Sequence, residues 1–164
     1  MNERVRFFIE KYIDLIEDNK FNGLYVEAEK YLPEDDIHIL TECLIDPQEG
    51  CKVLSNMTYV PKYYLATNTT ITQIELPDSI KIIRARAFDK CINLEEVILP
   101  ASVEVVDANA FSNCYSLKKL VVKNPDTSFS IVSTALSNNV EIYCKPRSKV
   151  EEANEVWHYP VHHI

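Results

Sequence analysis

The side chains best suited to catalysis or metal binding in this chain are its four histidines and five cysteines. Three of the histidines, His158, His162 and His163, lie among the last seven residues, and no cysteine stands at a short ligand spacing from them. Zinc sites typically use closely spaced pairs such as C-x-x-C, which the sequence lacks. A metal site at the open end is one interpretation of these histidines, and we favour the simpler one, a solvated tail.

The sequence also lacks the motifs of common enzyme active sites. Neither an H-E-x-x-H helix nor a G-x-S-x-G turn occurs, and the two glycines, Gly23 and Gly50, are too far apart for a phosphate-binding loop. The acidic run from Glu34 to Asp36 could suggest a metal site, but carboxylates in the first turn of a helix complement its dipole without an ion. We therefore expect a protein that is not an enzyme and uses no cofactor.

The cysteines predict free thiols. Their number is odd, and the first eighteen residues intersperse acidic side chains among apolar ones, unlike the uncharged apolar stretch of an export signal. We therefore expect a cytoplasmic protein, in which disulfides are uncommon. One pair, Cys91 and Cys114, occupies equivalent positions of a repeat and could lie within disulfide range; we favour the reduced state for it as well.

The charge distribution argues against two classes of partner. The net charge is -8; residues 1–56 hold six basic and thirteen acidic side chains, whereas residues 57–164 hold eleven and twelve. Binding to nucleic acid or to an anionic membrane needs a local cationic surface, which this distribution does not supply. We expect a protein partner, no direct nucleic-acid binding and no membrane.

Residues 1–46 have the pattern of three short helices. Apolar side chains recur every three and four residues over residues 3–18 and again over residues 20–31, so each stretch has one apolar stripe. Pro33 fits the first turn of a third helix, which should end before Pro47.

The chain then repeats itself with an offset of 23 residues. This offset aligns residues 71–93 with residues 94–116 and matches apolar, proline, alanine, phenylalanine and cysteine positions. The clearest matches are Ile74 with Val97, Leu76 with Leu99, Pro77 with Pro100, Phe88 with Phe111, and Cys91 with Cys114. Such a period is typical of solenoids, in which each unit buries its apolar face only against its neighbours.

Partial units precede and follow these two, and the last recognisable strand is Glu141–Cys144, which is shifted by one residue. Together they amount to about 3.5 units in residues 47–144, close to the minimum for a stable stack. We therefore expect a helical segment, residues 1–46, to cover one end of the solenoid and residues 145–164 to cover the other.

The units ITQIELPDSIKIIRARAFDKCIN (71–93) and LEEVILPASVEVVDANAFSNCYS (94–116) resemble the BspA-type leucine-rich repeat. The ending EIYCKPRSKVEEANEVWHYP (141–160) is similar to the tail of that family, a last strand followed by a short helix and a tryptophan. The resemblance covers about residues 57–160. It implies an α/β solenoid, a right-handed β-α superhelix, that offers binding surfaces rather than one reaction.

Two positions depart from the family pattern. Arg84 and Asp107 stand where the family usually has a glycine. Many relatives are also exported, whereas this sequence begins without an export signal. The helical start joined to few repeats also resembles small proteins of bacteriophages and gut bacteria.

The strand of each unit indicates which side chains face outward. The period of two turns Ile74 and Leu76 inward and leaves Gln73 and Glu75 on the outer face of the sheet. The following units place their equivalents alongside, in two ladders: Gln73, Glu96, Lys119 and Glu141, and Glu75, Ile98, Val121 and Tyr143.

Three members of the second ladder, Ile98, Val121 and Tyr143, predict an apolar strip on a face that should meet water. Exposed apolar area rimmed by polar groups marks interaction sites. The same strip could instead reflect cross-strand packing that only stabilises the sheet, or the termini of the chain could cover it. Our first hypothesis is a non-catalytic protein-protein interaction module that binds its partner through these eight residues.

A second hypothesis rests on the acidic N-terminal third. Its carboxylates could imitate nucleic acid and occupy the basic groove of a host defence protein that binds nucleic acid. A solvated helical surface explains the same charge more simply. Salt would distinguish the two modes of binding, because a mimic's complex should weaken steeply with ionic strength.

Two expectations concern the stacking of the units. Phe88 and Phe111 should stack inside the solenoid. On its other side, opposite charges should meet across the junction of the two units, Lys81 with Glu104 and Arg84 with Asp107.

Overall fold

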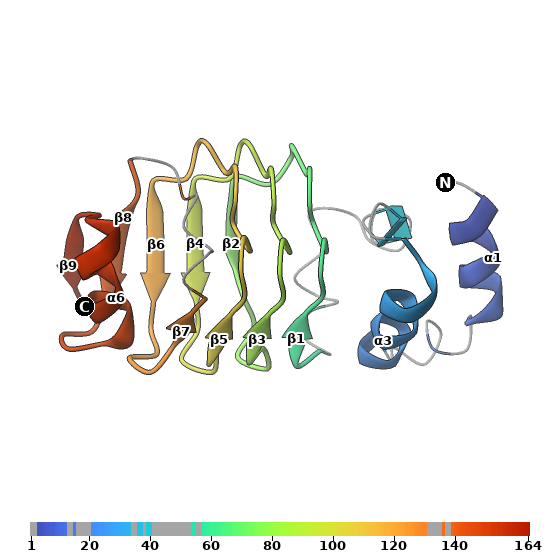
Figure 1. The fold of residues 1–164 in the computed structure, drawn as a ribbon, viewed down its shortest axis with the longest axis horizontal. Coiled ribbons are helices and arrows are strands. Elements are labelled where there is room, and N and C mark those ends of the chain that lie inside the picture. The colour runs from blue at the N-terminus through green and yellow to red at the C-terminus, as the bar shows by residue number, and fades with distance from the viewer. Residues whose placement is uncertain are drawn as a thin grey trace.

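The computed structural model of the chain describes residues 3–12, 15, 21–33, 36–37, 39–40, 54, 57–130, 136 and 139–164. The protein is a β-solenoid of about 4 turns (Figure 1). Helices α1 (Glu3–Lys11) and α3 (Phe21–Tyr31) lie beyond its first turn, and helix α6 (Lys149–Trp157) lies at the opposite end (Figure 1).

One side of the solenoid is a sheet of five parallel strands. In order they are β2 (Gln73–Glu75), β4 (Glu96–Leu99), β6 (Lys119–Val122), β8 (Glu141–Cys144) and β9 (Val161–His163). The register pairs Gln73 with Glu96, Glu96 with Lys119, and Lys119 with Glu141. The predicted offset of 23 residues, and its shortening by one residue at β8, are therefore confirmed.

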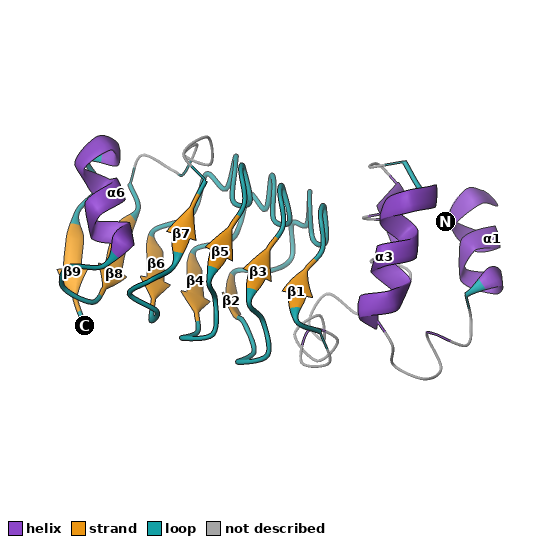
Figure 2. Cartoon of the chain, turned by 60° about the horizontal axis from the view of Figure 1, so that its bottom comes forward, coloured by secondary structure: helices purple, strands orange, loops and turns teal. Residues whose placement is uncertain are grey.

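The other side is a second parallel sheet, which the sequence pattern did not predict. Its strands are β1 (Tyr59–Val60), β3 (Ile82–Ile83), β5 (Val105–Val106) and β7 (Ser128–Phe129). Figure 2 shows the two sheets as two rows of arrows along the solenoid. In β1, β3 and β5 the second residue is buried and the first is partly buried, so even these short strands follow the alternation of a half-buried sheet.

The core runs between the sheets as columns of equivalent side chains. One column joins Ile74, Val97, Leu120 and Ile142 in successive strands, and each of them is buried. Burying a side chain of this size contributes about 1.5–3 kcal/mol. No single turn can bury such a column alone, so the stacking of turns stabilises the fold.

The segments that join the sheets are turns, and residues 57–130 contain no helix. The predicted β-α superhelix is therefore a β-solenoid in the described repeats. The backbone gives a reason: Arg86, Lys90, Asn109 and Asn113 all have φ between 57° and 60°. Left-handed residues at four-residue spacing interrupt a right-handed helix.

The N-terminal helices share the core of the solenoid. Val5 and Phe8 of α1 and Leu24 of α3 belong to the same buried cluster as the repeat columns. The ring of Tyr25 lies 5.8 Å from that of Tyr64 in the first turn, measured between centroids, and both side chains are buried.

Helix α6 follows strand β8, as the family resemblance implies, but a further strand, β9, comes after it. Ser148 caps α6 by accepting a hydrogen bond from the backbone N–H of Glu151, at 3.2 Å. Trp157 meets Phe129 of β7 edge to face, with 5.6 Å between ring centroids. Strand β9, which the sequence suggested to be a solvated tail, then pairs with β8.

Two expectations fall largely outside the described residues. The first is the third helix, for which the structure describes only residues 36–37 and 39–40, all helical. The second is the acidic run Glu34–Asp36, of which only Asp36 is described.

Candidate protein-binding surface

The predicted site residues form one continuous surface on the outer side of the five-stranded sheet, here called the strand face. The register places all eight of them as expected, in one ladder of polar residues and one that becomes apolar after Glu75. The ladders are Gln73, Glu96, Lys119 and Glu141, and Glu75, Ile98, Val121 and Tyr143.

The prediction that Val121 belongs to an exposed apolar strip is wrong, because Val121 is buried. Its side chain is only 9% exposed, whereas Ile98 and Tyr143 are partly buried. Val121 stands on a central strand between these two ladder neighbours, which shield it from both sides. The strip therefore presents Ile98 and Tyr143 to solvent, with Val121 packed between them.

Ion pairs link side chains of different strands across the strand face. Lys119 lies 2.7 Å from Glu96, and Lys123 reaches past the intervening strand to Glu75, at 3.0 Å. The side chains of both pairs are in contact with solvent, which screens the attraction between the charges. The pairs fix where positive and negative charges lie on the surface, which favours one orientation of a partner.

Tyr143 has contacts on three sides. The imidazole of His162 stacks on its ring, with centroids 4.7 Å apart and planes 20° apart, and the ammonium of Lys119 lies 5.3 Å from the ring centroid. The hydroxyl donates to a carboxylate oxygen of Glu141 at 2.9 Å, and this hydrogen bond is the main cause that raises the pKa of Tyr143. Coverage by the C-terminal segment, one of the open alternatives, therefore holds for part of this ring.

The histidines of β9 are not simply tail residues. His162 Nε2 lies 3.3 Å from a carboxylate oxygen of Glu141, and His163 Nε2 lies 2.8 Å from one of Glu151. His162 is thus a member of the strand face that was not predicted from the sequence. In the sequence, strand β9 is indicated only by the apolar Val161 followed by the polar His162, just after Pro160. Three residues are too few to establish the period of two of a strand.

A shallow polar groove of about 270 Å³ crosses the N-terminal ends of the first three strands of the sheet. It is lined by Thr72, Gln73, Glu95, Glu96, Lys118 and Lys119. Lys118 and Glu95, which pair at 3.0 Å, were not among the predicted residues, although they are 23 positions apart and of opposite charge. The repeat therefore contained the signal for this pair.

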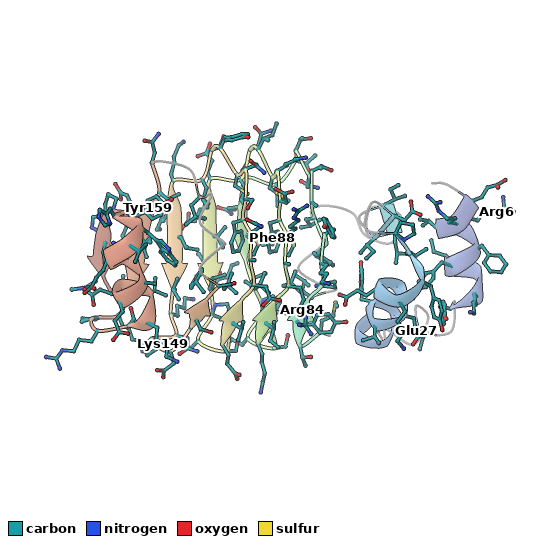
Figure 3. The ribbon with its side chains drawn as sticks, viewed as in Figure 1. Arg6, Glu27, Arg84, Phe88, Lys149 and Tyr159 are labelled. Carbon is teal, nitrogen blue, oxygen red and sulfur yellow. The ribbon has the colours of Figure 1, made fainter. Side chains whose placement is uncertain are left out.

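The opposite sheet carries the expected charge pairs. Lys81 lies 3.8 Å from Glu104, and Arg84 lies 3.9 Å from Asp107. Figure 3 shows the side chain of Arg84 beside the first turns of the solenoid. Its guanidinium carbon is also 5.7 Å from the ring centroid of Tyr59.

The thiols of Cys91, Cys114 and Cys144 are free and buried, as expected; Cys43 and Cys51 lie outside the described residues. Among the described residues, no group of three or more histidine, cysteine or acidic side chains could hold a metal ion. No helix in that part of the chain is both long enough and apolar enough to cross a membrane.

The model of the BspA type leucine-rich repeat region, which comprises six copies, matches residues 49–149 of the chain. This is more than half of its length. The protein belongs to the BspA-type leucine-rich repeat family. Comparison with curated proteins and with solved structures gave no match.

The structure explains how this BspA-type protein dispenses with two glycines of the family pattern. Arg84 and Asp107, which replace them, do not have positive φ angles, so they need no glycine. The left-handed conformation occurs two residues later, at Arg86 and Asn109. An L-residue can adopt it at a cost of about 1–2 kcal/mol.

Proposed function

We propose that this BspA-type protein is a non-catalytic interaction module and that its strand face binds another protein. The observation that carries the proposal is the row formed by Ile98, Val121 and Tyr143, bordered on one side by Glu96, Lys119 and Glu141. An apolar centre with a charged border is the arrangement of a typical protein-binding patch.

The rigidity of the strand face supports binding. Its strands are hydrogen-bonded to neighbours on a stack that buries columns of large apolar side chains, so the ladder residues are held at fixed spacing. A preorganised surface loses little conformational entropy when a partner docks. Tyr143 is already oriented by His162 and Glu141, as an aromatic anchor of an interface should be.

We also propose that helices α1 and α3 cover the first turn. Tyr25 and Tyr64 provide the contact that supports this role. Truncation of Tyr25 to alanine should lower the melting temperature of the whole chain in one transition. Two separate transitions, with that of the solenoid unchanged, would contradict it.

The test of the strand face is affinity capture with two matched double variants. The first, Ile98→Ser with Tyr143→Ser, removes the two partly buried apolar side chains of the strip and leaves the packed Val121 intact. The control, Ile82→Ser with Val105→Ser, makes the same kind of change on partly buried positions of the opposite sheet. A partner captured by the wild-type chain is purified, and its dissociation constant is measured with each variant.

We expect the strand-face variant to bind about tenfold more weakly or worse, and the control variant to bind as the wild type does. Circular dichroism and thermal melting establish that both variants are folded. Equal affinity of all three folded chains would show that the partner docks elsewhere.

A further inference from the structure

A second surface with the properties of a binding site lies on the N-terminal helices. It is a half-open groove of about 260 Å³ between α1 and the end of α3, here called the aromatic groove. Four aromatic rings line it, together with Leu32 and two cationic side chains. The rings are those of Phe7, Phe8, Tyr12 and Tyr31, and the cations are Arg4 and Lys11.

The four rings differ in how far they are exposed to solvent and in how firmly other residues hold them. Phe8 is buried and lies 4.6 Å from Tyr12 between ring centroids, and the Tyr12 hydroxyl donates to a Glu27 carboxylate oxygen at 3.1 Å. Phe7 and Tyr31, in contrast, are 69% and 62% exposed. Phe7 and Tyr31 therefore leave apolar surface in contact with water next to the packed rings of Phe8 and Tyr12, and a partner could cover this surface.

Arg4 and Lys11 differ in the groups that surround their charges. Arg4 is already neutralised by the buried carboxylate of Asp36, at 2.7 Å. Lys11 contacts ring faces, those of Tyr12 at 5.0 Å and Tyr31 at 5.1 Å, and forms no ion pair with a carboxylate among the described residues. Among the described residues, Lys11 is therefore the lining cation without a carboxylate at ion-pair distance, although its charge helps to lower the pKa of the nearby Glu27.

The size of the groove indicates what kind of ligand fits. About 260 Å³ is below the range of roughly 300–1,000 Å³ typical of small-molecule pockets. It suits one inserted side chain, as in complexes where a peptide places apolar anchors in a groove between helices. The described residues of the lining include two cationic side chains and no carboxylate, so the complementary peptide carries negative charge around its anchor.

We propose that the aromatic groove binds an acidic segment of a partner protein. The segment inserts one aromatic or branched aliphatic side chain between Phe7 and Tyr31 and places a carboxylate on the ammonium of Lys11. This site is independent of the strand face. It also gives the N-terminal helices a role opposite to nucleic-acid mimicry, because they accept negative charge there rather than present it.

The probe is a short fluorescein-labelled peptide with one phenylalanine among glutamates, and binding to the full chain is followed by fluorescence anisotropy. A second peptide has lysines in place of the glutamates, and a third has alanine in place of the phenylalanine. We expect the first to bind, with an affinity that falls as salt is added, and the other two to bind at least about tenfold more weakly.

Three variants locate the site. Lys11→Glu and Phe7→Ala should each weaken binding of the acidic peptide by about tenfold or more. Lys149→Glu makes the same charge change on α6, at the far end of the chain, and should leave binding unchanged (Figure 3). Phe7 is largely exposed, so its truncation should leave the fold intact, which a melting curve checks.

Three results would overturn the proposal: no binding of the acidic peptide to the wild-type chain, equal binding of the acidic and basic peptides, or unchanged binding to Lys11→Glu. Loss of peptide binding in the strand-face variant, with Lys11→Glu unaffected, would place the peptide on the strand face and would also overturn it. Failure here leaves the proposed function of the strand face intact, since the two sites share no residue.

Discussion

The rings of Phe88 and Phe111 lie parallel inside the solenoid, with centroids 5.1 Å apart and an angle of 1° between their planes. Both side chains are buried, and Figure 3 labels Phe88 among the stacked turns of the solenoid. Equivalent residues of successive units can stack in this way only if each unit repeats the geometry of the one before it. The 23-residue period is therefore a period of structure as well as of sequence.

The first prediction concerns this stack. Replacing Phe88 with alanine should lower the free energy of unfolding by about 3–5 kcal/mol, because it removes a buried ring and leaves a cavity that neighbouring turns cannot fill. Urea denaturation measures the change. The matched control is Phe7→Ala, which truncates an exposed ring of the same type and should change stability by less than about 0.5 kcal/mol. A Phe88→Ala chain as stable as the control would show that the ring does not support the stack.

The second prediction concerns the left-handed residues of the turns. Lys90 has φ of 60°, where a glycine avoids the steric cost that a Cβ imposes. Lys90→Gly should therefore be more stable than Lys90→Ala by about 1 kcal/mol. At Lys81, whose φ is not positive, the order should reverse, with the glycine variant less stable than the alanine variant. Thermal melting of the four variants measures the difference in stability between glycine and alanine at each position. If the same residue were the more stable one at both positions, the account of the turns would be contradicted.

The third prediction concerns alkaline pH. Burial, aided by the negative charge of Glu29, raises the pKa of Tyr59 from 10.0 to about 12, against the opposing effect of Arg84. Between pH 10 and pH 12 the folded state thus keeps a proton that the unfolded state loses. The free energy of unfolding should therefore fall as the pH rises through this window, and the contribution of Tyr59 is complete below pH 10.

Urea denaturation across that window measures the dependence on pH. Tyr59→Phe removes the ionisation and should flatten the decrease relative to the wild type. Tyr115→Phe, a change at an exposed tyrosine, should leave the decrease as it is. Identical slopes for the Tyr59→Phe and Tyr115→Phe chains would mean that Tyr59 does not contribute.

The fourth prediction concerns the buried thiols. The neighbouring Cys114 thiol and burial both raise the pKa of Cys91, and each of the two thiols donates to a backbone carbonyl at 3.1 Å. Since the thiolate is the reactive form, alkylation of both should be slow in the native chain and fast in urea. Peptide mapping by mass spectrometry after a timed reaction with iodoacetamide separates the sites. Labelling of Cys91 at the same rate in both conditions would refute the buried, hydrogen-bonded state.

The sequence predicted the parts of the fold that the repeat itself dictates. An offset of 23 residues was enough to pair β2 with β4 and β4 with β6, to stack Phe88 on Phe111 and to bring Lys81 near Glu104. Each of these depends on one rule, that equivalent residues of neighbouring units become spatial neighbours. No knowledge of the turns is needed to apply it.

The other features of the fold and of the strand face depend on contacts that the 23-residue repeat does not specify. The second sheet has strands of only two residues, too short to show a period of two. Strand β9 pairs with β8 across helix α6, and nothing in Val161–His163 indicates that partner. The burial of Val121 follows from its place on a central strand, which alternation alone cannot distinguish from an edge.

The most direct test of the central claim, that the strand face docks a protein, is hydroxyl-radical footprinting of the purified complex. Tyr143 on the strand face, Phe129 on the opposite sheet and the exposed Tyr115 in a turn report separately on three surfaces. We predict that the partner protects Tyr143 from oxidation and leaves Phe129 and Tyr115 as reactive as in the free chain. Unchanged oxidation of Tyr143 together with protection of Phe129 or Tyr115 would contradict the claim.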